Sequence, residues 1–290
     1  MGNITHNIMK KIALITGAIG SMGKEITKAV ANAGFTVIMA DLPKPDAEQA
    51  CTQIKQETNG KVVFMPLDLA STDSIFNFVA QIKNDFGQID LLINNAGALY
   101  PKRKDVDGKW DYTTMVNYFG HYVLTNKLLP LLNEGARIIN VTSLTYRFGK
   151  ITPQFFECGR NSWVDQVLNY SNSKLALLYF TLDLAEQLKE RNITANCSDP
   201  GIVGTNIIAM NNPTFDKICD VFARPFMTSP KNGAQTAIHL ALNEEGGNVS
   251  GGYFKNKKQI DILPRVLQSN EREMLKKLTQ DLLREKNITL

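Results

Sequence analysis

Short, continuous hydrophobic runs alternate with longer segments of mixed polar and apolar residues along most of the chain. Continuous apolar runs are typical of strands buried on both faces of a parallel sheet, whereas half-buried strands would alternate. The mixed segments carry their apolar residues at helical spacing. We therefore expect strands at residues 11–16, 36–40, 62–67, 89–93, 137–142 and 193–198, and helices at residues 22–33, 46–58, 72–86, 111–132 and 168–190.

This alternation of strands and helices predicts right-handed βαβ crossovers and hence an α/β fold. We expect a single-domain Rossmann fold, with a doubly wound parallel sheet of about seven strands and helices on both faces. The chain has 290 residues and contains no internal repeat and no linker rich in Pro, Gly or Ser. We therefore interpret residues 1–290 as one domain, in which ligands bind at the carboxyl ends of the strands.

The composition narrows the functional classes. Hydrophobic residues make up 43% of the chain and charged residues 21%, and the net charge is a mild +4, so we expect no nucleic-acid partner. The four cysteines and three histidines are scattered, which predicts no metal site and favours a reducing compartment. The first residues lack the apolar core of a signal peptide, and no apolar run is long enough to span a bilayer. We expect a cytoplasmic protein without stable membrane insertion.

The first predicted strand is followed by T-G-A-I-G-S-M-G, residues 16–23. Glycines between a strand and a helix let the backbone approach a pyrophosphate, which then lies on the helix N-terminus. The spacing of Gly17, Gly20 and Gly23 departs from the common G-x-G-x-x-G fingerprint, so taken alone the run could also be a simple turn.

The second strand ends at Asp41. A carboxylate at this place can accept hydrogen bonds from both adenosine ribose hydroxyls and would repel a 2′-phosphate, which favours NAD over NADP. Lys44 lies close enough in sequence to keep NADP as the less favoured alternative.

Polar residues also follow the third and fourth strands. Asp68 either meets an adenine edge or is an acidic residue ahead of the next helix. Residues 94–97, N-N-A-G, can join neighbouring strand-to-helix turns and leave room for a ribose.

The fifth strand is followed by Ser143, and a later helix carries Tyr170 and Lys174. The four-residue spacing places the phenol and the ammonium on one helix face. A nearby ammonium is expected to lower the pKa of the phenol, which would allow proton exchange near neutral pH. A serine hydroxyl at a strand end could hold the substrate oxygen meanwhile.

With these motifs together, the sequence resembles the short-chain dehydrogenases/reductases, and within them most resembles the retinol-dehydrogenase-like group. The similarity extends from residue 11 to about residue 254 and includes V-N-Y-F-G-H and D-P-G-I-V-G-T. It implies four catalytic residues, Asn117, Ser143, Tyr170 and Lys174, in which Asn117 holds a water that links the lysine to solvent. It also implies cofactor contacts from Gly17, Ile19, Ser21, Met22, Asp41, Asp68, Leu69, Asn95, Ala96, Gly97, Tyr170, Lys174, Pro200, Gly201, Val203 and Thr205. Ser21 replaces the usual middle glycine of the loop, and we expect its hydroxyl to donate to the pyrophosphate.

The resemblance divides the chain into a dinucleotide-binding and catalytic core (10–205), a lid over the substrate (206–230) and a C-terminal amphipathic helix (265–290). The lid is rich in Phe, Met and Ile, which predicts a lipophilic substrate, although a helix pair packed on the core gives the same pattern. An insertion at 147–160 is expected to form one wall of the substrate pocket. The C-terminal helix, with a stripe of Met274, Leu278 and Leu282, either docks on the domain, forms a dimer contact or adheres to a membrane.

The sequence thus predicts an NAD-dependent enzyme that interconverts an alcohol and a ketone or aldehyde of a small molecule. A non-catalytic dinucleotide sensor on the same fold is the alternative, but a sensor would need no proton relay. Relatives often pair through helices that correspond to 111–132 and 168–190, so a homo-oligomer is a further expectation.

Overall fold

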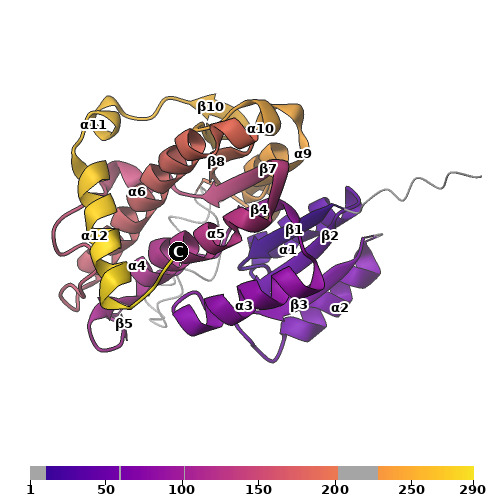
Figure 1. The fold of residues 1–290 in the computed structure, drawn as a ribbon, viewed down its shortest axis with the longest axis horizontal. Helices are drawn as coiled ribbons and strands as arrows, with labels where there is room; N and C mark the ends of the chain where they lie inside the picture. The colour runs from indigo at the N-terminus through magenta and orange to yellow at the C-terminus, as the bar shows by residue number, and fades with distance from the viewer. Residues whose placement is uncertain (1–10, 59, 101, 202–227) are drawn as a thin grey trace, which may run out of the picture.

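The computed structural model describes residues 11–58, 60–100, 102–201 and 228–290. Their centre is an eight-stranded sheet with the order β10-β9-β8-β7-β4-β1-β2-β3 (Figure 1). The strands are β1 Ile12–Thr16, β2 Thr36–Asp41, β3 Val62–Pro66, β4 Ile89–Asn94, β7 Leu132–Val141, β8 Thr194–Asp199, β9 Tyr253–Lys255 and β10 Lys258–Ile260. All neighbours pair in parallel except β9 and β10. The predicted doubly wound α/β fold is confirmed, with a short antiparallel strand added at one edge.

Helices cover both faces of this sheet. They are α1 Ser21–Asn32, α2 Ala47–Glu57, α3 Thr72–Asp85, α4 Tyr112–Thr114, α5 His121–Leu128, α6 Trp163–Gln187, α8 Pro230–Gly233, α9 Gln235–Leu242, α10 Glu244–Asn248, α11 Pro264–Leu267 and α12 Glu271–Glu285. Short 3₁₀ segments lie at Leu129–Leu131, Leu144–Phe148 and Lys189–Arg191, and β5 Asp105–Val106 pairs with β6 Trp110–Asp111.

Two hydrophobic cores form between the layers. One lies between the sheet and α3, α5, α6 and α12, and it contains most of the buried aromatic side chains. The other, with small and β-branched side chains, lies between the opposite face and α1, α2 and α9. Figure 1 shows α12, in yellow, beside α6. Strand order reverses between β1 and β4, so the carboxyl ends of these strands mark the place where the fold class binds its ligands.

Several predicted boundaries are wrong by a few residues. The expected helix at 111–132 is divided into α4, a π-helical segment at Met115–Gly120 and α5, and the strand expected at 137 already begins at Leu132. Leu132 pairs with Ile89 before an irregularity in the β4–β7 register, an extension that no local pattern announces. Helix α6 begins at Trp163 instead of 168, because the side chain of Ser162 caps it by accepting from the amide of Asp165.

The C-terminal amphipathic helix is α12, and it docks on the domain. Its buried residues are Leu275, Thr279, Leu282 and Leu283, whereas Met274 of the predicted stripe is exposed. The Thr279 hydroxyl lies 2.8 Å from the Tyr118 hydroxyl, and ion pairs join the helix to α6. Helix α12 therefore covers part of the surface that we expected to form an oligomer contact, and oligomerisation stays a prediction.

Candidate active site

The loop between β1 and α1 is shaped by its glycines. Gly17 has a φ of +64°, and a Cβ there would lie 2.7 Å from the Cα of Ala96. A Cβ on Gly23 would lie 2.2 Å from the carbonyl oxygen of Gly17. Gly20 caps α1 without a side-chain hydrogen bond, and Ser21, the first helical residue, is exposed. The first turn of α1 thus offers its amides to an anion, an arrangement that fits a dinucleotide pyrophosphate.

Asp41 is tied to this loop at the end of β2. One carboxylate oxygen accepts from the amide of Ile19 at 3.1 Å, and the other accepts from the amide of Leu42 at 2.8 Å. Burial raises the pKa of Asp41, while these two hydrogen bonds and the charge of Lys44 act in the opposite direction. Met22 is half-buried beside the second core. Binding of the adenosine ribose by this carboxylate stays a prediction.

Asp68 takes part in a local turn. Its carboxylate accepts from the amide of Ala70 at 2.8 Å, and its own amide donates to the Ser74 hydroxyl at 3.0 Å. The turn leads into α3, as the structural alternative for this residue expects. Leu69 is buried, and its carbonyl oxygen lies 2.2 Å from the place of a Cβ on Gly120, so only glycine fits at Gly120. Contacts of Asp68 and Leu69 with a cofactor stay predictions.

The N-N-A-G turn joins the strand ends, as expected. The buried Asn94 donates to Asn140 of β7 at 2.8 Å. Asn95 donates through its side chain to the carbonyl oxygens of Thr16 and Gly17, at 2.9 and 3.1 Å. Together with the close approach of Ala96 to Gly17, these bonds fix the glycine loop against the end of β4.

A buried chain of hydrogen bonds connects this turn to the helix of Asn117. The Thr16 hydroxyl oxygen accepts from the amides of Asn95 and Ala96, both at 3.0 Å, and lies 3.0 Å from Nε2 of His121. Its own proton must therefore go to His121 Nε2, which places the imidazole proton on Nδ1. Nδ1 then donates to the Asn117 carbonyl oxygen, 3.2 Å away. Burial lowers the pKa of His121 to about 3, so the ring is neutral. Sequence reasoning missed His121, although V-N-Y-F-G-H contains it.

Asn117 lies in the π-helical segment, a helical irregularity that often marks functional sites. Its side chain accepts from the amide of Ala98 at 2.7 Å and donates to the carbonyl oxygen of Ala98 and to the Ser173 hydroxyl, both at 3.0 Å. A Cβ on Gly97 would lie 3.6 Å from Lys174 Nζ and 3.8 Å from Asn117 Oδ1. The predicted asparagine and lysine thus meet at the exposed Gly97.

Lys174 is buried on α6, and its Nζ donates to the carbonyl oxygen of Val141, the last residue of β7, at 2.8 Å. Burial lowers the pKa of Lys174 to about 8, while the charge of Asp199 acts in the opposite direction. The ammonium lies 5.5 Å from the centroid of the Tyr170 ring. The predicted face of α6 is therefore present, with both side chains turned to the carboxyl ends of the strands.

Tyr170 and Ser143 also come together, and a hydrogen bond between their side chains lowers the pKa of the phenol. Burial is the larger influence and, with the charge of Asp199, raises the pKa of Tyr170 to about 12. This direction is opposite to the lowered pKa that we expected from the lysine. The sequence pattern identified the neighbouring cation but not the burial or the carboxylate.

Pro200 and Gly201 follow β8. Gly201 has a φ of +74°, and its amide donates to a carboxylate oxygen of Asp199 at 2.7 Å. Pro200 is half-buried. Val203, Thr205 and most of the predicted lid lie outside the described residues. Sequence reasoning missed Asp199, for which the one signal is its place at the end of a strand, in D-P-G-I-V-G-T.

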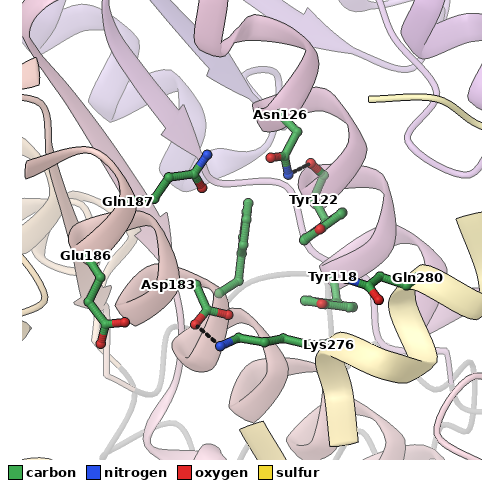
Figure 2. Close-up of a pocket in the computed structure, with 9 residues that line it drawn as sticks. Tyr118, Tyr122, Asn126, Asp183, Glu186, Gln187, Lys276 and Gln280 are labelled. Atoms are coloured by element: carbon green, nitrogen blue, oxygen red, sulfur yellow. Dashed lines mark hydrogen bonds and ion pairs between the residues drawn. The ribbon is translucent and has the colours of Figure 1, made fainter. Parts of the chain in front are cut away.

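Two surface pockets among the described residues lie apart from these groups. One of about 490 Å³ is lined by Tyr118, Tyr122, Asp183 and Lys276 between α5, α6 and α12, as Figure 2 shows. The other, of about 520 Å³, is bounded by the insertion. Phe155 of the insertion packs against Tyr118 in the core.

Comparisons with known proteins identify the family and the fold. A family model described as short chain dehydrogenase matches residues 11–215. Retinol dehydrogenase 14 of Mus musculus is 35% identical over 280 residues, which cover 90% of this chain and 82% of the relative. A polyprenol dehydrogenase of Danio rerio is 34% identical over 268 residues, covering 87% and 80%. A solved short-chain dehydrogenase/reductase from Serratia marcescens has a TM-score of 0.68 at 25% identity, covering 85% of this chain and 96% of that one.

The chain belongs to the short-chain dehydrogenase family, and the resemblance to retinol dehydrogenases is confirmed. It is an oxidoreductase of a family that binds nicotinamide dinucleotides. Within the described part of the chain, no helix has the length and apolar character needed to cross a bilayer.

Proposed function

We propose that the protein uses NAD to interconvert an alcohol and a ketone or aldehyde of a lipophilic small molecule. The observation that carries the proposal is the meeting of Ser143, Tyr170, Lys174 and Asn117 at the carboxyl ends of β4 and β7, although they come from three separate segments. In the described residues the site contains a proton donor, a cation and a hydroxyl within reach of one another, as hydride-transfer chemistry on a carbonyl requires.

The glycine loop, Asp41 and the N-N-A-G turn would hold the dinucleotide, which supplies or accepts the hydride when bound. Lys174 would bind the nicotinamide ribose, because its ammonium lies beside Gly97 at the end of β4. Asp41 favours NAD over NADP, since a half-buried carboxylate at the end of β2 disfavours a 2′-phosphate. Lys44 lies close enough for its charge to act on Asp41. Because of this nearby cation, NADP is kept as the less favoured alternative.

The remaining roles belong to this chain's own side chains. Tyr170, with a pKa of about 12, carries its proton at neutral pH and is ready to donate it to a carbonyl oxygen. Ser143 hydrogen-bonds Tyr170 and would hold the same oxygen. The Lys174 ammonium stabilises the phenolate left after proton transfer. Asn117 would support the relay from its place beside Lys174, with its side chain held by Ala98 and Ser173.

The substrate class follows from two independent points. The predicted lid at 206–230 is rich in apolar residues, and two relatives are named for retinol and polyprenol. We infer a substrate with an extended apolar part attached to the alcohol or carbonyl group. We further propose that the protein acts in the cytoplasm.

The test is to follow NADH absorbance with a panel of lipophilic aldehydes, ketones and alcohols, and to compare wild type with Tyr170→Phe. We expect Tyr170→Phe to lower the rate by at least about a hundredfold, because the proton donor is lost. Tyr122→Phe, which removes a hydroxyl from the cavity beside α12, is the matched control and should retain the wild-type rate. Equal rates in wild type and Tyr170→Phe would contradict the mechanism. Cofactor binding without turnover of any panel member would favour the sensor.

A further inference from the structure

Asp199 is a buried carboxylate at the end of β8, 1% exposed, with no part in the mechanism above. Both of its oxygens are fixed. Oδ2 accepts from the Tyr253 hydroxyl at 2.7 Å, and Oδ1 accepts from the Gly201 amide at 2.7 Å. A buried charge is costly unless a partner of opposite sign compensates it, so a positive charge is expected close to Asp199.

Side-chain alternation shows the direction in which Asp199 points. Cys197, two residues earlier on β8, hydrogen-bonds Thr181 of α6, so Cys197 and Asp199 both face α6. Lys174 of α6 reaches the strand ends on this same face, where its Nζ donates to Val141 of the neighbouring strand β7. The ammonium of Lys174 is therefore the cation that faces Asp199.

The other titratable groups around Asp199 are neutral hydroxyl and thiol groups. The Tyr253 hydroxyl of β9 donates a hydrogen bond to Asp199, and Cys197 lies on the same strand. The charge of Asp199 also acts on Tyr170 of α6. Burial raises the pKa of Tyr253 and raises that of Cys197 to about 12, so both keep their protons at neutral pH. The Tyr146 ring packs against Tyr253 at a tilt, with ring centroids 5.0 Å apart. Among the described residues that face Asp199, Lys174 alone carries a positive charge.

We propose that Asp199 is a positioning residue for the catalytic pair, one that keeps Lys174 charged despite its burial and keeps Tyr170 in its protonated form. The proposal rests on the proposed function for its catalytic meaning. The electrostatic effects support the geometry, because the charge of Asp199 acts on both residues and raises the pKa of each. The consequence is a site set to donate a proton, as carbonyl reduction requires.

The experiment measures the titration of Lys174 and Tyr170 directly, in the full chain without added cofactor or substrate. Protein labelled with ¹³C at lysine Cε and tyrosine Cζ is titrated by NMR, and the two signals are assigned with Lys174→Met and Tyr170→Phe. In Asp199→Asn we expect the Lys174 midpoint to fall by about one pH unit, and the Tyr170 midpoint to fall as well. An unchanged or raised Lys174 midpoint would overturn the proposal.

Two control variants separate charge from packing. Tyr253→Phe removes a hydrogen bond to Asp199 but keeps its charge, and Asp183→Asn removes a carboxylate from the distant, half-exposed end of α6. Both should leave the Lys174 midpoint close to that of wild type. A fall in Tyr253→Phe as large as in Asp199→Asn would assign the effect to packing and contradict the proposal.

If Asp199→Asn does not fold, Asp199→Ser, which keeps an acceptor for the Gly201 amide, takes its place. Failure of both variants to fold would show a structural role and overturn the proposal. The titration does not depend on turnover, so an inactive wild type would refute the proposed function while this measurement still decides the role of Asp199.

Discussion

At the cofactor end of the sheet, the loop after β1 takes its shape from missing side chains, since Gly17 and Gly23 leave no room for a Cβ. At the catalytic end, the shape depends on buried polar groups, with Lys174 and Asp199 both almost fully enclosed. The first arrangement depends on steric fit, whereas the second depends on charges that change with pH. Substitutions at the two ends of the site should therefore have different effects, and each end can be tested separately.

The largest expected effect concerns the steric end. In Gly23→Ala the new Cβ would lie 2.2 Å from the Gly17 carbonyl oxygen, so backbone must move. We expect the free energy of unfolding to fall by about 2–3 kcal/mol and NADH binding to weaken strongly. Urea denaturation followed by circular dichroism measures the first, and NADH fluorescence the second. The matched control is Gly20→Ala in the same loop, whose Cβ would meet only the Gly17 carbonyl oxygen at 3.3 Å and which should stay within about 0.5 kcal/mol of wild type.

The second prediction concerns the link between the two ends. Thr16→Val removes the hydroxyl that accepts from the amides of Asn95 and Ala96, and we expect the free energy of unfolding to fall by about 2 kcal/mol. Thr16→Ser keeps the hydroxyl and should retain most of the stability. The ¹⁵N shifts of His121 provide an independent measurement, since the wild type should show a protonated Nδ1. A protonated Nε2 in the wild type would contradict the proposed chain of hydrogen bonds.

The third prediction tests the titration of the catalytic end. Lys174 has a pKa lowered to about 8, so its ammonium is present below that pH and is lost above it. Tyr170, with a pKa of about 12, stays protonated throughout this range. The kcat/KM for carbonyl reduction should therefore be constant below pH 8 and fall by about tenfold for each further unit. A profile that stays flat to pH 10 would show that the charge of Lys174 is not required.

The smallest expected effect concerns Asp41. In Asp41→Ser the carboxylate that disfavours a 2′-phosphate is removed, and the affinity ratio of NADH to NADPH should fall by about fivefold, or about 1 kcal/mol. Dissociation constants measured by fluorescence with both cofactors give the ratio. Glu57→Gln, a surface carboxylate on α2, is a control and should leave the ratio unchanged. Tighter binding of NADPH than NADH by the wild type would show that Asp41 was misread.

The sequence predicted the structural elements that depend on residues close to one another along the chain. Strand ends, the glycine loop and the helical spacing of Tyr170 and Lys174 all depend on neighbours within a few residues, and the structure contains them. The π-helical segment at Asn117 has no local signature in the sequence, and at its end Gly120 packs closely against Leu69 from a distant part of the chain. The raised pKa of Tyr170 was missed for the same reason. Asp199, which contributes to it, comes close only when β8 pairs with β7.

The docking of α12 also has a consequence for the order of folding. The buried Tyr118 hydroxyl hydrogen-bonds the Thr279 hydroxyl, 161 residues later in the chain. The Tyr179 hydroxyl donates to the carbonyl oxygen of Val266. During synthesis from the N-terminus, the helices of Asn117 and Tyr170 are complete long before this cover exists. We therefore expect one aromatic face of the catalytic layer to stay open to water until α12 leaves the ribosome, and closure of that face to be among the last folding steps of a newly made chain.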